Sequence, residues 1–550
     1  MSGFSPTFPL TVIGIFGVFS LVQLYLYARK DTPVYCFLTA YLDVVITFST
    51  AVLLPYDICV TVDENGHSPS IALLWRTIYW CLVVFNWILL PIFIEHQRTG
   101  NWRESVIMNS LYWVAYAVIG FISLAIYLAQ VGFTSLSEIY NFFYSLSFAG
   151  SNAYGLGLIS ILLGYAFVAL PQYLYLISQP QKHLDRLYAN VVEADEYRLS
   201  SKFDLEDRFN MFRQVAPPEA PSARAAEIAE TAARFLNKAL NDQAGHLRPR
   251  RQEEEAKSFW AQAAGKTSEL GRLGDALNAA ESAVCKFDGL VDQCIELEAY
   301  LAKSLSPLQM QLFDAKLIFA RISSYACGFL SVVIIMAQAT IFIPLWWLSL
   351  LAVAYREVVV HLVTRNDSSE AWGSFLEVLV GIPLVYGYLA SFWAAFRFKL
   401  SLAYGLYPKH NTHPYSLMWC ASVMSRIAMS LCYNYIYMLR MQHDSVKTAF
   451  MTFSRTMSMV PFFGSTFVNV LPFLIVIFAV MQYTNTYHRM MHYLGLSGLQ
   501  MESAVIVGRG EQVKAEGKRI VAREKSKRSG ASQPSSLGKP AGSLVNPIQN

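Results

Sequence analysis

The feature that most constrains this chain is a series of nine long apolar stretches, each with enough residues to cross a lipid bilayer as a helix. Such a helix needs about 20 mostly apolar residues, because each residue rises about 1.5 Å along the helix axis. The sequence therefore predicts an all-α, polytopic membrane protein. The stretches cover residues 8–28, 34–55, 72–94, 106–130, 152–177, 318–343, 373–396, 415–438 and 462–485.

The charged residues are few and unevenly placed. Only 15% of the 550 residues are charged, against about 25% in an ordinary soluble domain. The net charge is +4, yet residues 509–539 carry nine Lys or Arg against three Glu. A basic tail beside a membrane span predicts attraction to anionic lipid. The alternative is a disordered tail that only solubilises the chain.

The basic residues also predict an orientation. Arg29 and Lys30 follow the first apolar stretch, which favours an N-terminus outside or in a lumen and, after nine spans, a cytoplasmic C-terminus. The basic segment 439–461 is an exception on the predicted outer side. Either contacts override its charge, or the last helices are miscounted. The outer segment 345–370 contains a possible N-glycosylation site at Asn366.

These features divide the chain into four parts. Residues 1–177 and 318–490 are the two membrane parts, 178–317 is a helical cytoplasmic insert, and 491–550 is a basic, largely disordered cytoplasmic tail. Within the insert, apolar residues recur in steps of three and four from Leu270 to Leu305, a heptad pattern typical of a coiled-coil-like helix. The stripe is wide, so the helix needs a partner, most simply from residues 181–212. We expect it to connect rigidly to the sixth span.

Ionisable groups inside the spans are costly, at about 2.5–3.5 kcal/mol each by insertion scales, so each requires an explanation. The candidates for an intramembrane polar site are Asp43, Glu377, Arg426 and Asn434. The functional interpretation is a pathway for an ion, proton or solute. The structural alternative is an ion pair between a carboxylate and Arg426 that locks helices together, with amides such as Asn434 serving as packing contacts.

The sequence offers no catalytic or metal-binding constellation. It lacks a phosphate-binding glycine loop, an H-E-x-x-H motif and a serine nucleophile elbow. His410 and His413 lie close together, but no carboxylate or cysteine accompanies them. We therefore expect neither enzymatic activity nor a cofactor, and no nucleic-acid partner.

Several motifs in chain order resemble LMBR1-type membrane proteins, the limb-region and lipocalin-interacting membrane receptor family, and most of all the branch called LMBR1 domain-containing protein 2. The run from Asn152 through Gly155 and Gly164 to Pro171 resembles the family's fifth span. The segment Leu54-Pro55-Tyr56-Asp57 looks like the end of its second span, and the segment from His410 to His413, followed by Arg426 and Asn434, is similar to the region around its eighth. The resemblance covers nearly all of the membrane region.

The resemblance implies nine spans, an outer N-terminus, a cytoplasmic helical insert and no enzymatic activity. It also implies roles in ligand uptake by endocytosis, vitamin traffic from lysosomes or modulation of receptor signalling, at the plasma membrane or an endosomal or lysosomal membrane. Our leading hypothesis is a receptor or adaptor whose insert, 178–317, binds cytoplasmic trafficking or signalling proteins. The alternative is a transporter or channel for a small solute, ion or lipid.

Overall fold

Helices account for the fold of this computed structural model, and one isolated bridge, between Ala28 and Thr412, is the single β-type pairing among the described residues. These are residues 4–64, 66, 68–100, 102–132, 135–215, 228–236, 269–341, 343, 345–361, 370–397, 405–441, 447–454, 465–493 and 510–528. Asn366 lies outside this part of the chain.

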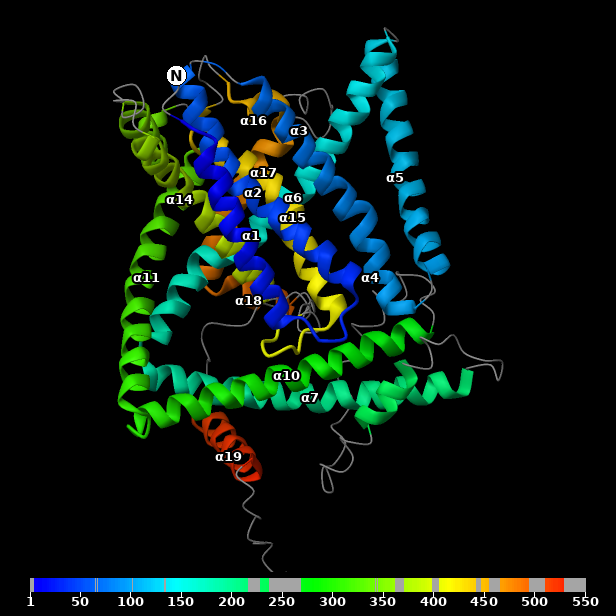
Figure 1. Ribbon diagram of the computed structural model, residues 1–550, viewed down its shortest axis with the longest axis vertical. Helices are drawn as coiled ribbons and strands as arrows, with labels where there is room; N and C mark the ends of the chain where they lie inside the picture. The colour runs from blue at the N-terminus through cyan, green and yellow to red at the C-terminus, as the bar shows by residue number, and fades with distance from the viewer. Residues whose placement is uncertain are drawn as a thin grey trace, which may run out of the picture.

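Helices occupy all nine stretches that were expected to span the membrane (Figure 1). Seven of them are long and apolar enough to cross a membrane, and α15 and α17 run beside them in the bundle. The prediction of an all-α, polytopic membrane protein is confirmed. The helices are α1 (Thr7–Tyr27), α2 (Val34–Glu64), α3 (Pro69–Val84) with its continuation α4 (Leu90–Thr99), α5 (Trp102–Val131), α6 (Leu136–Ile177), α11 (Pro307–Ala339), α14 (Glu370–Ala395), α15 (Pro414–Met438) and α17 (Ser465–Tyr483).

Helix α15 lies inside the bundle. Most of its 25 residues are buried, against α2, α4, α6 and α14. The polar side chains of α15 therefore face other helices, where hydrogen-bond partners exist. Because little of α15 would contact lipid, its surface need not be apolar. By contrast, α1 and α5 lie at the periphery, and most of their apolar side chains are exposed.

Two helices extend beyond the predicted ends of their spans. Helix α2 continues through Pro55 to Glu64, beyond the stretch 34–55 that was predicted to span the membrane. The proline removes one backbone hydrogen bond from the helix. Its ring packs closely against Gly381 of α14, where an added Cβ would lie 3.3 Å from Pro55 Cγ. Helix α6 starts at Leu136 and has 42 residues. Hydropathy identifies the apolar part of each helix, whereas both helices continue beyond that part.

The insert forms a pair of helices, α7 (Pro180–Val215) and α10 (Glu269–Leu301), which lie across one end of the bundle (Figure 1). We call this pair the platform. The predicted partner of the heptad helix is confirmed, since α10 packs along α7 through residues such as Leu187, Val191, Phe287 and Val291.

The expected rigid continuity between the heptad helix and the sixth span is wrong. Helix α10 ends at Leu301, and α11 starts at Pro307 in another direction (Figure 1). Lys303 has a φ of 55°, and Ser306 forms a capping box with Gln309 that begins the new helix. A turn with its own cap therefore separates the platform from the sixth span.

The tail also differs from its expectation. Residues 510–528, predicted to be largely disordered, form helix α19 (Gly510–Arg528), which packs on α7 and α10. Ile520 and Val521 are buried there, and a Cβ added at Gly517 would lie 2.1 Å from the carbonyl oxygen of Tyr188. The glycine permits this approach of the two backbones. The smaller elements are η1 (Phe85–Leu89), η2 (Trp346–Leu348), α12 (Leu350–Val353), η3 (Ala354–Val360), α16 (Ala449–Ser454) and α18 (Thr486–Tyr493).

Candidate functional site

Asp43 lies at the centre of a buried polar cluster between α2 and α15. Its side chain is fully buried, and neither carboxylate oxygen accepts a hydrogen bond. Ser425 and Arg426 of α15 are its polar neighbours. The ion pair with Arg426, which was the structural alternative, is not formed: in the described structure no nitrogen of Arg426 lies within 4.0 Å of the Asp43 carboxylate. Arg426 therefore compensates the carboxylate only at longer range.

Asn86 adds an amide to this cluster from a π-helical turn. The turn is η1, which joins α3 to α4. Asn86 Oδ1 accepts hydrogen bonds from Ser425 Oγ at 2.8 Å and Ser422 Oγ at 3.3 Å, while its amide donates to the carbonyl of Leu82. π-turns within α-helices often occur at functional sites. Here the π-helical turn contains Asn86, whose side-chain amide connects the α3–α4 helix to α15.

The other two candidates lie elsewhere. Glu377 of α14 is 4% exposed, one of its oxygens has no hydrogen-bond partner, and it lies near Tyr56 and Cys59. Cys59 is about 24 Å along α2 from Asp43, given 1.5 Å per residue. Asn434 is buried on α15, and its Oδ1 also has no partner. The four predicted residues therefore do not converge on one site.

Asp57, which the sequence marked only through a family-like motif, is a buried carboxylate with all its partners in place. Trp75 Nε1 donates to Oδ2 at 3.0 Å, and the backbone nitrogens of Ala449 and Phe450 donate at 3.1 and 2.9 Å. Thr61 Oγ1 adds a longer bond at 3.4 Å. A carboxylate at the first N–H groups of a helix satisfies donors that have no partner within it. Asp57 thus joins α2, α3 and α16.

The fifth-span motif consists of points where backbones approach closely. A Cβ at Gly155 would lie 2.1 Å from Ser430 Oγ of α15, and one at Gly164 would lie 2.4 Å from Phe478 Cβ of α17. Ser430 Oγ donates to the carbonyl of Asn152, and Ser324 Oγ of α11 donates to the carbonyl of Pro171. The motif therefore fixes how α6 packs against its neighbours.

His413 has a capping role. It precedes α15, and its Nδ1 accepts a hydrogen bond from the backbone nitrogen of Tyr415 at 3.3 Å. The residues before it close the end of α1: the backbone nitrogens of His410 and Thr412 donate to the carbonyls of Leu26 and Tyr27. This segment thus connects α15 to the end of the first helix.

Arg440 is the first basic residue of the segment 439–461, of which the structure describes residues 439–441 and 447–454. It is 2% exposed, and its Nη1 donates to the carbonyls of Ile341 at 2.7 Å and Ile343 at 3.0 Å. Its Nη2 donates to the carbonyl of Thr340, just beyond the end of α11. A cation is favoured at a helix C-terminus because the unpaired carbonyls carry partial negative charge. Contacts that override the charge, the first of the two explanations, are therefore present at Arg440.

The platform is joined to the bundle by ion pairs from α10. Arg29 Nη1 lies 2.8 Å from Glu281 Oε2, and Arg98 Nε lies 3.9 Å from Asp275 Oδ2. Lys409 Nζ lies 3.5 Å from Asp292 Oδ2. The Arg29–Glu281 pair is the shortest of the three, and both of its side chains are less than one third exposed, so we expect it to contribute most; exposed pairs are typically worth about 0–1 kcal/mol.

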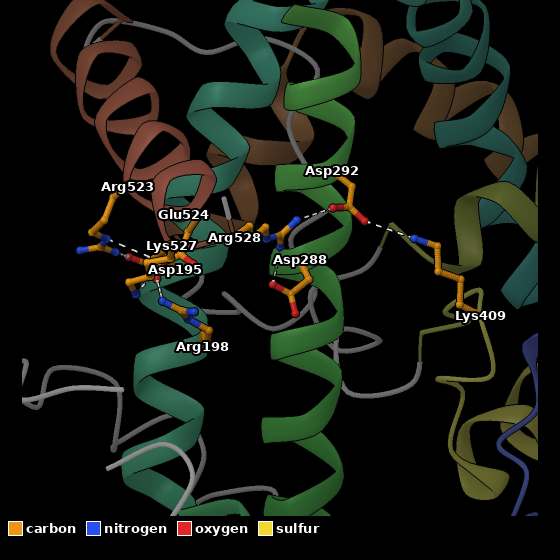
Figure 2. A network of polar contacts seen from close by, with 9 residues as sticks. All are labelled: Asp195, Arg198, Asp288, Asp292, Lys409, Arg523, Glu524, Lys527 and Arg528. Atoms are coloured by element: carbon orange, nitrogen blue, oxygen red, sulfur yellow. Dashed lines mark hydrogen bonds and ion pairs between the residues drawn. The ribbon is translucent and has the colours of Figure 1, made fainter. Parts of the chain in front are cut away.

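The same face of α10 binds the tail helix. Arg528 pairs with both Asp288 and Asp292, so Asp292 lies between Lys409 of the bundle and Arg528 of α19 (Figure 2). Arg523 of α19 pairs with Asp195 of α7 at 3.7 Å. No motif in the sequence points to these contacts. The available signal was the set of acidic residues on α10 that lie off its apolar seam: Asp275, Glu281, Asp288 and Asp292.

A helix bundle with an outer surface of apolar side chains, crossed at one end by a polar platform, defines a multi-pass integral membrane protein. The comparison with family models agrees: residues 7–487 match the LMBR1-like membrane protein family. The chain belongs to this family, as its motifs indicated.

Its relatives include LMBR1 domain-containing protein 2 homolog A of Dictyostelium discoideum, 21% identical over 481 residues, which are 81% of this chain and 62% of the relative. The G-protein coupled receptor-associated protein LMBRD2 of Gallus gallus is 21% identical over 84% of the chain and 70% of the relative. The Homo sapiens protein of that name is 20% identical over 82% and 68%. The chain thus spans less than two thirds of the Dictyostelium relative. No solved structure matches.

Proposed function

We propose that this chain is a membrane adaptor that associates with receptors in the bilayer and transmits their state to cytoplasmic proteins through its platform. The observation that carries the proposal is the set of ion pairs between α10 and the bundle, above all Arg29–Glu281. Because α10 is fixed to the bundle at several points, a displacement of the membrane helices changes the position of the platform. Several relatives are named G-protein coupled receptor-associated proteins, which makes that class of receptor the first partner to test.

The charges support a cytoplasmic platform. Arg29, Arg98 and Lys409 all lie at the end of the bundle that contacts α10. Basic residues beside membrane spans favour the cytoplasmic side. With the platform on that side, the N-terminus of α1 faces the outside or a lumen. The plasma membrane and endosomal or lysosomal membranes are the proposed locations.

Helix α5 is the proposed receptor contact within the membrane. In the described structure it packs on α4 and on α6, and much of its length stands apart from the bundle (Figure 1). Leu111, Val114, Phe121 and Ile122 are all more than half exposed. Contact with lipid alone would suit such an apolar surface. The reason to propose a protein partner is that several relatives are named as receptor-associated proteins.

A substitution that removes one charge but keeps the size of the side chain tests the coupling. Glu281→Gln removes the pairing of the platform with Arg29, whereas Asp31→Asn removes the other carboxylate bound by the same guanidinium and leaves α10 untouched. In cells, the second messenger produced by a G-protein-coupled receptor is measured with each variant, together with proximity of the variant to the receptor. We expect Glu281→Gln to keep receptor proximity but lose its effect on the signal, and Asp31→Asn to behave as wild type.

Two results would contradict this function. One is a full signalling effect from Glu281→Gln, which would remove the platform contact from the mechanism. The other is a lack of proximity between the wild-type chain and any receptor in a broad panel.

A second candidate function, passage of an ion or proton through the bundle, rests on one observation. Asp43 is a buried carboxylate without a hydrogen-bond partner, and intramembrane ionisable groups often mark conduction or proton-relay paths. In liposomes containing the purified chain, proton and cation fluxes would then fall in Asp43→Asn. Glu377→Gln is the variant for comparison, because it also removes a buried carboxyl group, but one that lies far from the Asp43 cluster. An absence of flux, or flux unchanged in Asp43→Asn, would reject this candidate.

A further inference from the structure

A cavity of 1020 Å³ lies between the membrane bundle and the platform. Its walls come from α1, α2, α14 and α15, and its floor comes from α7 and α10. Binding pockets for small organic molecules typically measure about 300–1,000 Å³. The cavity is therefore slightly larger than that range and has room for a large ligand.

The part of the cavity next to the membrane helices is apolar. Phe16 and Phe19 of α1, Phe48 of α2, and Leu389 and Phe392 of α14 line it. Phe19 is 56% exposed and Leu389 is 61% exposed, so the cavity opens at the surface of the bundle between α1 and α14. Both helices are apolar enough to cross a membrane. The opening therefore faces the lipid rather than water.

The part next to the platform is basic. His183 and Arg186 of α7, Lys286 of α10 and Arg397 at the end of α14 line it. Asp292 is the single carboxylate among the described lining residues, and it is already bound by Lys409 and Arg528. This end of the cavity thus carries a net positive charge.

Two further observations concern the basic end of the cavity: the first locates it relative to the membrane, and the second gives the charge of His183. Arg397 lies over the rings of Tyr173 and Trp393, at 4.4 and 4.7 Å from their centroids. Such aromatic side chains are enriched where hydrocarbon meets the polar headgroups. Burial and the positive charges of Arg186 and Lys316 lower the pKa of His183 to about 4. The imidazole is therefore neutral near pH 7 and remains available as a hydrogen-bond donor to an anion.

We infer that the cavity binds one anionic phospholipid from the leaflet beside the platform. The headgroup phosphate lies among Arg186, Lys286 and Arg397, and an acyl chain extends between α1 and α14. The ligand matches the site in three respects: negative charge at the basic end, hydrocarbon at the apolar end, and entry from the bilayer through the lateral opening. A free phosphate compound matches only the first.

Native mass spectrometry of the full chain in detergent tests this inference, because it counts bound lipids directly. The probes are dioleoylphosphatidylglycerol, dioleoylphosphatidylcholine with the same chains, and glycerol 3-phosphate as a headgroup without chains. We expect one phosphatidylglycerol to bind at least tenfold more tightly than phosphatidylcholine, and glycerol 3-phosphate not to bind.

Matched variants locate the lipid. Arg186→Gln with Lys286→Gln removes two charges from the cavity and should weaken phosphatidylglycerol binding at least tenfold. Lys182→Gln with Lys518→Gln removes the same charge from exposed positions outside the cavity and should leave binding unchanged. Leu389→Trp, at the opening, should weaken binding of both phospholipids without changing any charge. Retention of the wild-type melting temperature shows that each variant is folded.

Three outcomes would overturn the inference. The first is equal affinity for the two phospholipids. The second is tight binding of glycerol 3-phosphate, which would make the site one for a soluble phosphate. The third is unchanged phosphatidylglycerol binding in both Arg186→Gln/Lys286→Gln and Leu389→Trp, which would place the bound lipid elsewhere on the protein.

Discussion

Oδ2 of Asp57 lies 2.9 Å from the backbone nitrogen of Phe450, although 393 positions separate these residues in the chain. The bond attaches α16 to the last third of the second helix. Because Trp75 donates to the same oxygen at 3.0 Å, one carboxylate also ties α3 into this end of the bundle.

Removal of this carboxylate should destabilise the bundle strongly. In Asp57→Ala, two backbone N–H groups and the Trp75 indole lose a charged acceptor in a buried position. Hydrogen bonds to charged groups contribute about 1.5–3 kcal/mol each, so we expect a loss of about 3 kcal/mol or more. The thermal unfolding midpoint of the detergent-solubilised chain measures it. Glu64→Gln, at the exposed end of the same helix, is the control. Equal midpoints for the two variants would show that the Asp57 contacts add nothing.

Two glycines on α6 provide a test of helix packing. Gly155→Ala places a methyl group 2.1 Å from Ser430 Oγ and 2.9 Å from the carbonyl of Arg426, which forces α15 outward. Overpacking of this kind typically costs about 1–3 kcal/mol. Gly157→Ala meets no atom within 4 Å, and the higher helix propensity of alanine, worth up to about 1 kcal/mol, should make it neutral or stabilising. If both substitutions lower the unfolding midpoint alike, the close contact between α6 and α15 is not present.

The tail helix should detach when its contact with α7 is blocked. In Gly517→Leu a side chain would occupy the space of the Tyr188 carbonyl, whereas Ala522→Leu adds similar bulk on an exposed face of α19. We expect trypsin to cleave the tail of Gly517→Leu at least several-fold faster, because cleavage requires an undocked segment. Wild-type and Ala522→Leu proteins should be cleaved at similar, slower rates. Fast cleavage of the wild-type tail would indicate that α19 does not stay docked.

His183 predicts a pH dependence of stability. Burial, Arg186 and Lys316 lower its pKa to about 4 in the folded state, against 6.5 for an ordinary histidine. Between these values the unfolded chain binds more protons, so the contribution of His183 to stability is fully present above pH 6.5 and is lost as the pH falls towards 4. We expect the unfolding midpoint of His183→Gln to fall less than that of wild type between pH 7 and pH 4.5. Parallel pH profiles would contradict this assignment.

The heptad pattern shows how far a local signal extends. The apolar spacing from Leu270 onward correctly predicts a helix and a partner from residues 181–212, because both follow from which residues must leave water. It does not predict that the flanking acids, Glu281 and Asp292, meet Arg29 and Lys409, because these contacts depend on where the end of the bundle lies. The direction of α10 relative to α11 depends on the short turn between them, and the heptad pattern carries no information about it.

Asp43 and Asp57 show the same division within one helix. Both are carboxylates within α2, and their cost in a membrane is a property of the residue type that the sequence alone determined, as it determined where the apolar helices lie in the chain. Only the tertiary structure decided that Asp57 receives four hydrogen bonds while Asp43 receives none. The physical reason is that hydropathy is summed over neighbouring residues, whereas a buried charge is satisfied by groups that reach it from distant parts of the chain.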